Sequence, residues 1–311
     1  MSRKSCAIIV VYNKVPKLNQ INVALLQKEL DYLIIVDNSN KAEFIEGIKS
    51  QYIAKNTGRY FLIQNHENLG ISKALNKGIN LALEKGVYFM FLLDDDAVLS
   101  QSFFKREINV FEDLLERGEM VGAVCPVVSN DINQLGKKIK KYDLSQIRQA
   151  ITSGLLLSKE TIQIVGLYPE EFFLEWADIA YTRRILNKGL KIFRINEVLI
   201  FQDFGESVRE KRISLFPYFI LSIIENRVIF NLGYGNDFFR YAPIYSPERE
   251  IQIIKERIRL GYLSQGGKIH RLLFMLKFTL NIFLRETTLF IGTKNADYIK
   301  AFKILKYFKG R

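Results

Sequence analysis

The chain has 311 residues, of which 48% are hydrophobic and 25% are charged, and its formal net charge is +12. This length allows one large domain or a domain with an appendage, and the composition excludes an intrinsically disordered chain. The positive charge favours an anionic partner such as phosphates, a nucleic acid or an acidic membrane surface.

Two features indicate a cytoplasmic protein. Both cysteines, Cys6 and Cys125, lie in apolar runs without metal-ligand spacing, which predicts buried, reduced thiols. The apolar run near the N-terminus is too short for the core of a signal peptide. No stretch reaches the roughly 18 uncharged apolar residues of a spanning helix, because Lys277 and Asn281 interrupt the longest one.

The first third of the chain alternates between strand-like and helical segments. Short apolar runs at 6–12, 32–36, 60–63 and 87–93 predict strands, and apolar residues at helical spacing predict helices at 15–30 and 72–84. This alternation is typical of a doubly wound α/β fold with a mostly parallel central sheet. Gly78 indicates that the second helix packs closely on that sheet, and Ser72 is placed to cap it.

Polar side chains follow each of these strands. They are Asn13, Asp37 with Asn38, Asn68, and the run Asp94-Asp95-Asp96. Ligands bind at the carboxyl ends of the strands in open α/β sheets, so these side chains are expected at one binding edge. Three adjacent carboxylates behind a buried strand repel one another unless a cation lies among them, which predicts a metal site. The alternative is a solvated acidic turn.

The next elements are predicted from shorter patterns. They are a helix at 101–117, a strand at 121–126 that Pro126 ends, a surface loop at 129–145, a core segment at 151–157, a helix at 179–186, and two short strands at 190–195 and 198–201. Glu175 and Asp178 lie three residues apart at the start of the second of these helices. They are either functional carboxylates on one helix face or acids that stabilise the helix N-terminus.

The pattern then changes to helices. We expect them at 216–232, 248–259, 268–285 and 297–308, so the chain divides into a domain at 1–212 and a helical region at 213–311. Lys and Arg interleave with apolar residues from Arg249 onward, which favours an anionic membrane surface over a nucleic-acid groove. The alternative is that these apolar stripes form a core.

The carboxylates suit one chemistry in particular. A divalent cation held by carboxylates and bridging two phosphates acts as a Lewis acid for a diphosphate leaving group. Glu175 or Asp178 is then available as a general base that takes a proton from an attacking hydroxyl group.

Several motifs together resemble family 2 glycosyltransferases of the GT-A fold, close to the rhamnosyltransferase-like branch. They are Val11-Tyr12-Asn13, Val36-Asp37-Asn38-Ser39, Asn68-Leu69-Gly70, Leu93-Asp94-Asp95-Asp96-Ala97 and Phe173-Leu174-Glu175-Trp176-Ala177-Asp178-Ile179. The resemblance implies a Rossmann-like GT-A catalytic domain, followed here by the C-terminal helical region.

The resemblance also implies roles for individual residues. The nucleotide-binding residues would be Tyr12, Asn13, Asp37, Asn38, Asn68, Gly70, Asp94 and Asp95. Of these, Asp37 and Asn38 would contact the base, and Asp95 would reach the sugar or its ribose. Asp94 and Asp96 would be the DxD-type carboxylates that hold Mn²⁺ or Mg²⁺ and the diphosphate.

The same resemblance assigns the acceptor side. Asp178 would be the catalytic base of a single displacement that inverts the anomeric carbon, and Glu175 with Trp176 would bind the acceptor. The sequence departs from the family at the His-x-x-Gly motif, where it reads Gln202-Asp203-Phe204-Gly205. Gln202 would then be the remaining metal ligand, with Asp203 one position later as the alternative, and oxygen donors suit Mg²⁺ or Mn²⁺.

The implied function is an inverting, metal-dependent glycosyltransferase. It would move a rhamnose-like or other hexose from a dTDP- or UDP-linked donor to a polysaccharide or lipid-linked acceptor, peripherally at the inner face of the plasma membrane. A nucleic-acid partner is not expected, and the chain would act as a monomer or a homo-oligomer.

Two other functions remain open. A sugar nucleotidyltransferase requires a glycine-rich phosphate loop after the first strand, and the loop at 13–16 contains no glycine. A non-catalytic, membrane-associated assembly protein on a degenerate transferase fold agrees with the missing histidine, but not with the retained aspartates.

Overall fold

The computed structural model describes residues 3–16, 19–50, 58–140, 143–173 and 176–202, together with 207–209, 241–243 and 256. The chain divides into two compact units, Met1–Asp203 and Phe204–Arg311. In the second unit, β10 (Ser207–Arg209) pairs with β11 (Tyr241–Pro243) in a two-stranded antiparallel sheet. The helices predicted after residue 213 lie outside the described residues.

The first unit is built on one sheet. In the described part of the chain it has nine strands: β1 (Ser5–Val11), β2 (Tyr32–Asp37), β3 (Tyr60–Gln64), β4 (Phe89–Asp94), β5 (Val98–Leu99), β6 (Val121–Ser129), β7 (Leu144–Ile147), β8 (Leu155–Ser158) and β9 (Lys191–Phe201). Their order is β3-β2-β1-β4-β8-β6-β9-β5, with β7 also beside β9. The pairings orient β1 to β4, β6 and β9 one way and β5, β7 and β8 the other, which confirms a mostly parallel α/β sheet.

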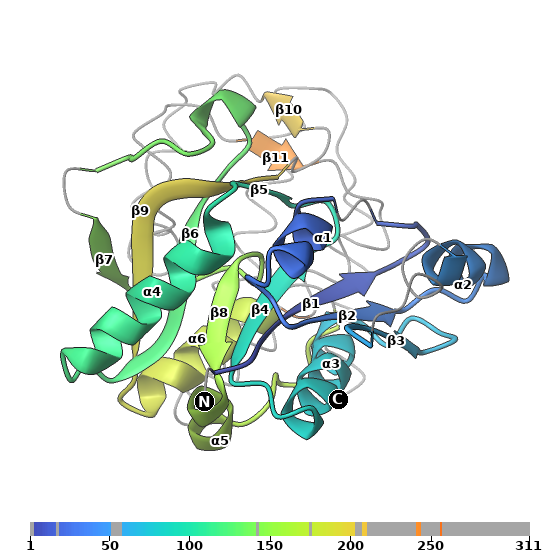
Figure 1. Cartoon of the computed structure of the whole chain (residues 1–311), viewed down its shortest axis with the longest axis horizontal. Helices are drawn as coiled ribbons and strands as arrows, with labels where there is room; N and C mark the ends of the chain where they lie inside the picture. The colour runs from blue at the N-terminus through green and yellow to red at the C-terminus, as the bar shows by residue number, and fades with distance from the viewer. Residues whose placement is uncertain are drawn as a thin grey trace, which may run out of the picture. The chain divides into compact units, whose positions relative to one another are not determined.

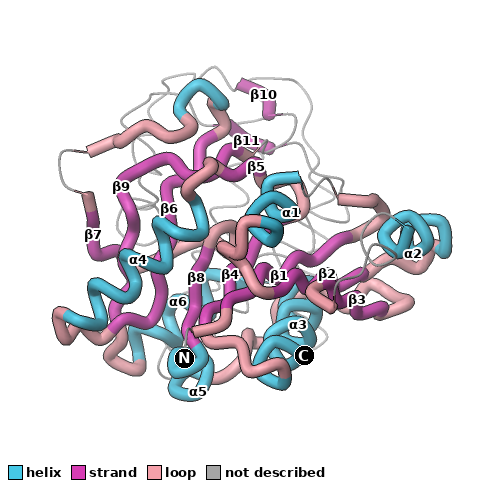
Figure 2. Tube along the Cα trace, viewed as in Figure 1, coloured by secondary structure: helices cyan, strands magenta, loops and turns pink. Residues whose placement is uncertain are grey.

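Helices cover both faces of this sheet (Figures 1 and 2). They are α1 (Asn19–Leu26), α2 (Ala42–Ile48), α3 (Ile71–Glu84), α4 (Phe103–Glu116), α5 (Lys159–Val165) and α6 (Ala177–Asn187), with a 3₁₀ turn, η2, at Ile132–Gln134. Ala7 and Ile9, alternate residues of β1, pack with residues of α1 and α4 in one hydrophobic core. On the other face, α3 packs so closely that a side chain at Gly78 would collide with Ile8, which confirms the predicted role of this glycine.

Aromatic side chains fill the core beneath α4. Phe91 of β4 makes an edge-to-face contact with Phe104, whose ring centroid lies 4.9 Å away, and Phe89 makes another with Phe111 at 5.4 Å. Burial of one such side chain contributes about 1.5–3 kcal/mol to folding. The carboxyl end of β4, which carries the three aspartates, is therefore anchored in a well-packed part of the unit.

The structure corrects three predictions in the middle of the chain. β6 continues through Pro126 to Ser129, because the proline lies at a register shift in the pairing with β9, where a ladder donor is not required. β9 is one strand of 11 residues and is not divided at Asn196. The segment 129–145 is only partly loop, since η2 and the start of β7 lie within it.

Smaller differences concern the helix ends. Gly70 is the N-cap residue of α3, so the prediction that Ser72 caps this helix is wrong; Ser72 is buried one residue inside its start. α2 and α5 were not predicted, although Ser158 caps α5 by accepting a hydrogen bond from the Thr161 amide at 3.1 Å. Cys6 and Cys125 are buried and free, as expected. No helix within the described ranges is long and apolar enough to cross a membrane.

Candidate active site

The polar residues that follow the strands come together at one edge of the sheet. Val11 of β1 is in register with Asp37 of β2, and Val10 is in register with Asp94 of β4. Asp37 in turn lies opposite Gln64, the last residue of β3. Because these strands are parallel and end level with one another, side chains far apart in sequence meet at this edge, where ligands bind in open α/β sheets.

Two of the three consecutive aspartates converge on Gln202. The Gln202 carboxamide, one residue beyond the end of β9, donates hydrogen bonds from Nε2 to Asp94 Oδ2 at 2.7 Å and to Asp96 Oδ1 at 3.1 Å. Gln202 is 8% exposed, and its buried Oε1 atom has no hydrogen-bond partner among the residues that the structure describes. The structure therefore brings all three predicted metal ligands to one point.

The ionisation of Asp94 reflects this crowding. Its pKa is raised to about 6, first by burial of the carboxyl group and then by the negative charges of Asp96 and Asp95, against the opposing hydrogen bond from Gln202. Within the described residues, no group of three Asp, Glu, His or Cys side chains is placed to hold a metal ion. The third oxygen donor near Asp94 and Asp96 is instead an amide.

The middle aspartate has a different partner. Asp95 Oδ1 forms an ion pair of 2.8 Å with the Nζ atom of Lys14, in the loop after β1. Burial raises the pKa of Asp95, and Lys14 opposes this rise by hydrogen bonding and by its charge. The sequence reasoning missed Lys14 as a site residue, although its position directly after Asn13 was the available signal.

The end of β2 forms a second polar centre. Asp37 Oδ1 accepts a hydrogen bond from the Ser39 amide at 2.9 Å, and Ser39 Oγ accepts one from the Asn13 amide at 2.7 Å. Asp37 is fully buried, and in the described part of the chain its Oδ2 atom and Asn13 Oδ1 are buried without hydrogen-bond partners. Tyr12 beside them is 51% exposed. Buried oxygens that accept no hydrogen bond are costly, which marks this end of the sheet as a place for a ligand donor.

Asn38 belongs to a chain of side-chain amides. Its Oδ1 atom accepts from Asn65 Nδ2 at 2.6 Å, and its Nδ2 atom lies 3.4 Å from Asn68 Oδ1 and 3.3 Å from the Gly70 carbonyl oxygen. Lys77 of α3 donates to Asn65 Oδ1 at 2.6 Å. Asn65 and Lys77 were not predicted as site residues. Asn65 directly follows β3 but belongs to none of the motifs that carry the resemblance, and Lys77 lies within α3.

A segment from much later in the chain crosses the start of α3. The Ile71 amide donates to the Phe173 carbonyl at 2.6 Å, and a side chain at Gly70 would collide with the Phe173 backbone. Asn76 of α3 binds both the amide and the carbonyl of Tyr168, at 2.8 and 3.0 Å. α3 and the segment 168–173 before α6 are therefore held together.

Asp178 lies in the first turn of α6. Its Oδ1 atom accepts a hydrogen bond from the Ile179 amide at 2.7 Å, and this end of a helix favours an ionised carboxylate. Trp176, directly before the helix, has a left-handed backbone conformation with φ of 64°. The pKa of Tyr168 is raised by burial first, and the charges of Asp178 and Asp94 both add to the rise, so the two carboxylates act on one side chain. Glu175 lies outside the described residues.

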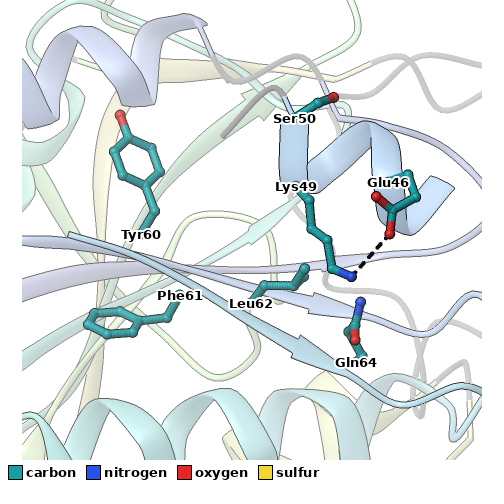
Figure 3. A pocket seen from close by; sticks show the side chains of 7 residues that line it. All are labelled: Glu46, Lys49, Ser50, Tyr60, Phe61, Leu62 and Gln64. Carbon is teal, nitrogen blue, oxygen red and sulfur yellow. Dashed lines mark hydrogen bonds and ion pairs between the residues drawn. The ribbon is translucent and has the colours of Figure 1, made fainter. Parts of the chain in front are cut away.

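A pocket also lies at the outer edge of the sheet, between α2 and β3 (Figure 3). It is about 610 Å³ in volume, and Tyr60, Phe61, Leu62 and Gln64 line it from β3. Lys49 and Glu46 form an ion pair of 3.1 Å beside it. None of the predicted site residues lines this pocket.

Comparisons with known proteins agree with this arrangement. The model of Glycosyl transferase family 2 matches residues 6–189, from β1 to the end of α6. The dTDP-rhamnosyl transferase RfbF of Shigella flexneri is 29% identical over 226 residues, which are 66% of this chain and 71% of the relative.

The fold is shared with a solved structure as well. The crystal structure of GalNAc-T7 with UDP, GalNAc and Mn²⁺ superposes with a TM-score of 0.52 at 13% identity. The match covers 64% of this chain and 44% of the other, so the chain spans less than half the length of that protein. On the family match over 6–189, with the strand ends and the polar edge in place, this chain belongs to glycosyl transferase family 2.

Proposed function

We propose that this glycosyltransferase is inverting and metal-dependent, and that it moves a rhamnose-like or other hexose from a nucleoside diphosphate to a polysaccharide or lipid-linked acceptor. The observation that carries the proposal is the convergence of Asp94, Asp96 and Gln202 at the same sheet edge as Asp37 and Asn38. A diphosphate and its base require these two kinds of site, one for a cation and one for hydrogen bonds.

The residues present fit a divalent cation. Gln202 Nε2 reaches both carboxylates, so one carboxylate oxygen of Asp94 and one of Asp96 face a common point. Rotating the carboxamide by half a turn would direct its buried Oε1 atom toward that point. Three oxygen donors suit Mg²⁺ or Mn²⁺, and a cation there would also relieve the repulsion among the aspartates. When bound, such an ion stabilises the negative charge that develops on the leaving diphosphate.

Asp178 supplies the proton acceptor in the proposed reaction. The acceptor hydroxyl attacks the anomeric carbon, the bond from that carbon to the diphosphate breaks on the opposite face, and the hydroxyl proton passes to the Asp178 carboxylate. The Ile179 amide orients this carboxylate through Oδ1, and the helix end keeps it ionised before the transfer. Trp176 and Glu175 are proposed to hold the acceptor beside it.

The donor side rests on the nucleotide edge and on relatives. Tyr12, Asn13, Asp37 and Asn38 are proposed to hold the nucleoside, and Asn68, Gly70 and Asp95 the rest of the nucleotide. A dTDP- or UDP-linked sugar is proposed because the Shigella flexneri relative is a dTDP-rhamnosyl transferase. The cytoplasmic face of an anionic membrane is proposed as the site of action, on the strength of the basic C-terminal sequence.

Metal-dependent nucleotide binding tests this function most directly. Calorimetric titration of the full chain with UDP and dTDP should show binding that Mn²⁺ or Mg²⁺ strengthens, and Asp94→Ala or Asp96→Ala should remove the metal effect. Donor hydrolysis by the wild type in the presence of metal would separate an enzyme from a non-catalytic assembly protein. Unchanged affinity in both variants would contradict the metal site.

A further inference from the structure

The chain of amides that ends at Asn38 has a fixed direction. Lys77 Nζ can only donate, so the atom of Asn65 that it contacts at 2.6 Å must be the oxygen. The nitrogen of Asn65 then faces Asn38 at 2.6 Å, and the atom of Asn38 on that side must be its oxygen. A single ammonium group on α3 therefore determines the orientation of two buried carboxamides.

The contacts on the other side of Asn38 require the same orientation of its carboxamide. The Gly70 carbonyl can only accept, and it lies 3.3 Å from the Nδ2 atom of Asn38. Asn68 Oδ1, 3.4 Å from the same nitrogen, is itself fixed as an oxygen because the Gly70 amide donates to it at 3.0 Å. Reversing the Asn38 carboxamide would place its oxygen against two acceptors and its nitrogen against a donor.

Asn38 is thus left with one kind of hydrogen-bonding capacity. Both hydrogens of Nδ2 are directed at Asn68 and Gly70, whereas Oδ1 receives one hydrogen bond from the described residues, which leaves it a second lone pair. Asn38 is only 3% exposed, so water competes little for that lone pair. The adjoining residue, Asp37, adds a buried Oδ2 acceptor for which the described ranges supply no hydrogen-bond donor. The end of β2 therefore offers hydrogen-bond acceptors to a ligand, and Asn38 offers no donor.

We propose that Lys77 and Asn65 are positioning residues that make this site select nucleoside diphosphates whose base presents a ring N–H group, such as uracil or thymine, over cytosine. This inference rests on the proposed function, because it takes the base to lie against Asn38. Uracil and thymine carry a hydrogen on N3, which an acceptor satisfies, whereas cytosine presents a lone pair at N3 and would face the Asn38 oxygen unfavourably. Leaving buried polar groups without hydrogen bonds weakens binding by about tenfold or more.

The test compares UDP, dTDP and CDP by calorimetric titration of the full chain with Mn²⁺ present. The wild type should bind UDP and dTDP at least about tenfold more tightly than CDP. In Asn65→Asp the carboxylate still pairs with Lys77 but cannot donate to Asn38. The Asn38 nitrogen should then turn toward residue 65, and the preference for UDP over CDP should fall by about tenfold or reverse.

Lys77 provides a second set of variants. Lys77→Met should lower the UDP preference, and Lys77→Arg, which keeps a donor, should retain it. Lys73→Met is the matched control, one turn earlier on the exposed side of α3, and should leave the preference unchanged. The ratio of the two affinities is informative because general damage to the fold weakens UDP and CDP binding alike.

Each outcome decides the inference. The inference is overturned if the wild type binds UDP and CDP with equal affinity. It is also overturned if Asn65→Asp and Lys77→Met both keep the wild-type ratio of UDP to CDP affinity. Either result leaves the proposed function standing. If none of the three nucleotides binds, the proposed nucleotide site itself is refuted.

Discussion

At the scale of single residues, Glu107 is a buried carboxyl group outside the candidate active site. It lies on α4, its side chain is fully buried, and neither carboxylate oxygen has a hydrogen-bond partner within the described residues. Burial alone raises the pKa of Glu107 well above its ordinary value. The folded protein therefore holds this group in its protonated form.

We predict that Glu107→Gln stabilises the protein at neutral pH. Below about pH 4 the wild-type carboxyl is protonated in both states. As the pH rises above its unfolded pKa of about 4.3, the unfolded chain releases the proton and the folded chain keeps it. Stability therefore falls by up to about 1.4 kcal/mol per pH unit until the folded pKa is passed. Glutamine cannot ionise, so the variant should lack this loss.

Chemical denaturation between pH 4 and pH 8 measures this difference. The free energies of unfolding of the variant and the wild type should differ little near pH 4 and diverge as the pH rises. Glu116→Gln, at an exposed position of the same helix, should follow the wild-type curve. Parallel pH curves for Glu107→Gln and the wild type would show that Glu107 is ionised in the folded state.

Asp178 allows a separation of binding from chemistry. Asp178→Asn retains the shape of the side chain and an oxygen that can accept from the Ile179 amide, but it cannot take up the proton of the acceptor. Nucleotide affinity should stay near the wild-type value, while sugar transfer should fall by about 10²-fold or more. Transfer at the wild-type rate would remove Asp178 from the role of base.

Gln202 allows a test of the third metal ligand. Gln202→Leu removes the oxygen donor from the cluster with Asp94 and Asp96, so the affinity for Mn²⁺ should fall by about tenfold. Gln202→His restores a ligand atom and should recover most of that affinity. Electron paramagnetic resonance measures the concentration of free Mn²⁺, so the affinity for the ion is obtained without measuring enzyme activity. Equal affinities in all three proteins would mean that Gln202 does not hold the ion.

At the scale of elements, the close approach of the segment 168–173 to α3 depends on Gly70. Its φ of +82° is costly for any residue with a side chain, and a Cβ atom would also collide with the Phe173 backbone. Gly86 has a similar φ of +72°, but open space around it. Comparing the same substitution at the two glycines therefore separates the cost of backbone strain from the cost of the collision.

We predict that Gly86→Ala lowers the free energy of unfolding by about 1 kcal/mol and that Gly70→Ala lowers it by about 1–3 kcal/mol more. Gly70→Ala should also weaken nucleotide binding, because the collision displaces the start of α3 from Phe173. Denaturant titration gives the first quantity and calorimetry the second. Equal losses in the two variants would show that the segment around Phe173 moves away without cost.

At the scale of the whole molecule, the charge is unevenly distributed along the chain. Residues 204–311 contain 19 Lys and Arg against nine Asp and Glu, so the second unit carries ten of the twelve net positive charges. Basic residues interleaved with apolar ones are attracted to anionic lipid headgroups by about 1 kcal/mol for each Lys or Arg near the surface.

This distribution predicts salt-dependent binding to anionic membranes. The full chain should sediment with vesicles that contain phosphatidylglycerol at low ionic strength, and about 0.5 M salt should release it because screening shortens the range of the attraction. Phosphatidylcholine vesicles are the control and should not retain it. Recovery of the protein in the supernatant with both kinds of vesicle would contradict a peripheral membrane location.

The sequence by itself determined the fold class and the edge of the sheet at which the polar residues gather. Buried strands are short apolar runs, and polar residues at their ends are visible without any knowledge of contacts, which is why Asp37 and Asp94 to Asp96 could be assigned to one edge. The local patterns failed where pairing overrides them, as at Pro126 and along β9, because a bulge or a long strand is decided by the neighbouring strand.

Only the tertiary structure decided which side chains meet. The family resemblance had already grouped Gln202 with Asp94 and Asp96, but only the structure gives the hydrogen bonds between them. Lys77 sets the orientation of Asn38 through Asn65, and no spacing rule connects these three residues. Hydrogen bonds of side chains depend on distances of a few tenths of an ångström across the fold. A linear pattern can name the chemical groups at a site, but their partners and direction follow from how the strands and helices are packed.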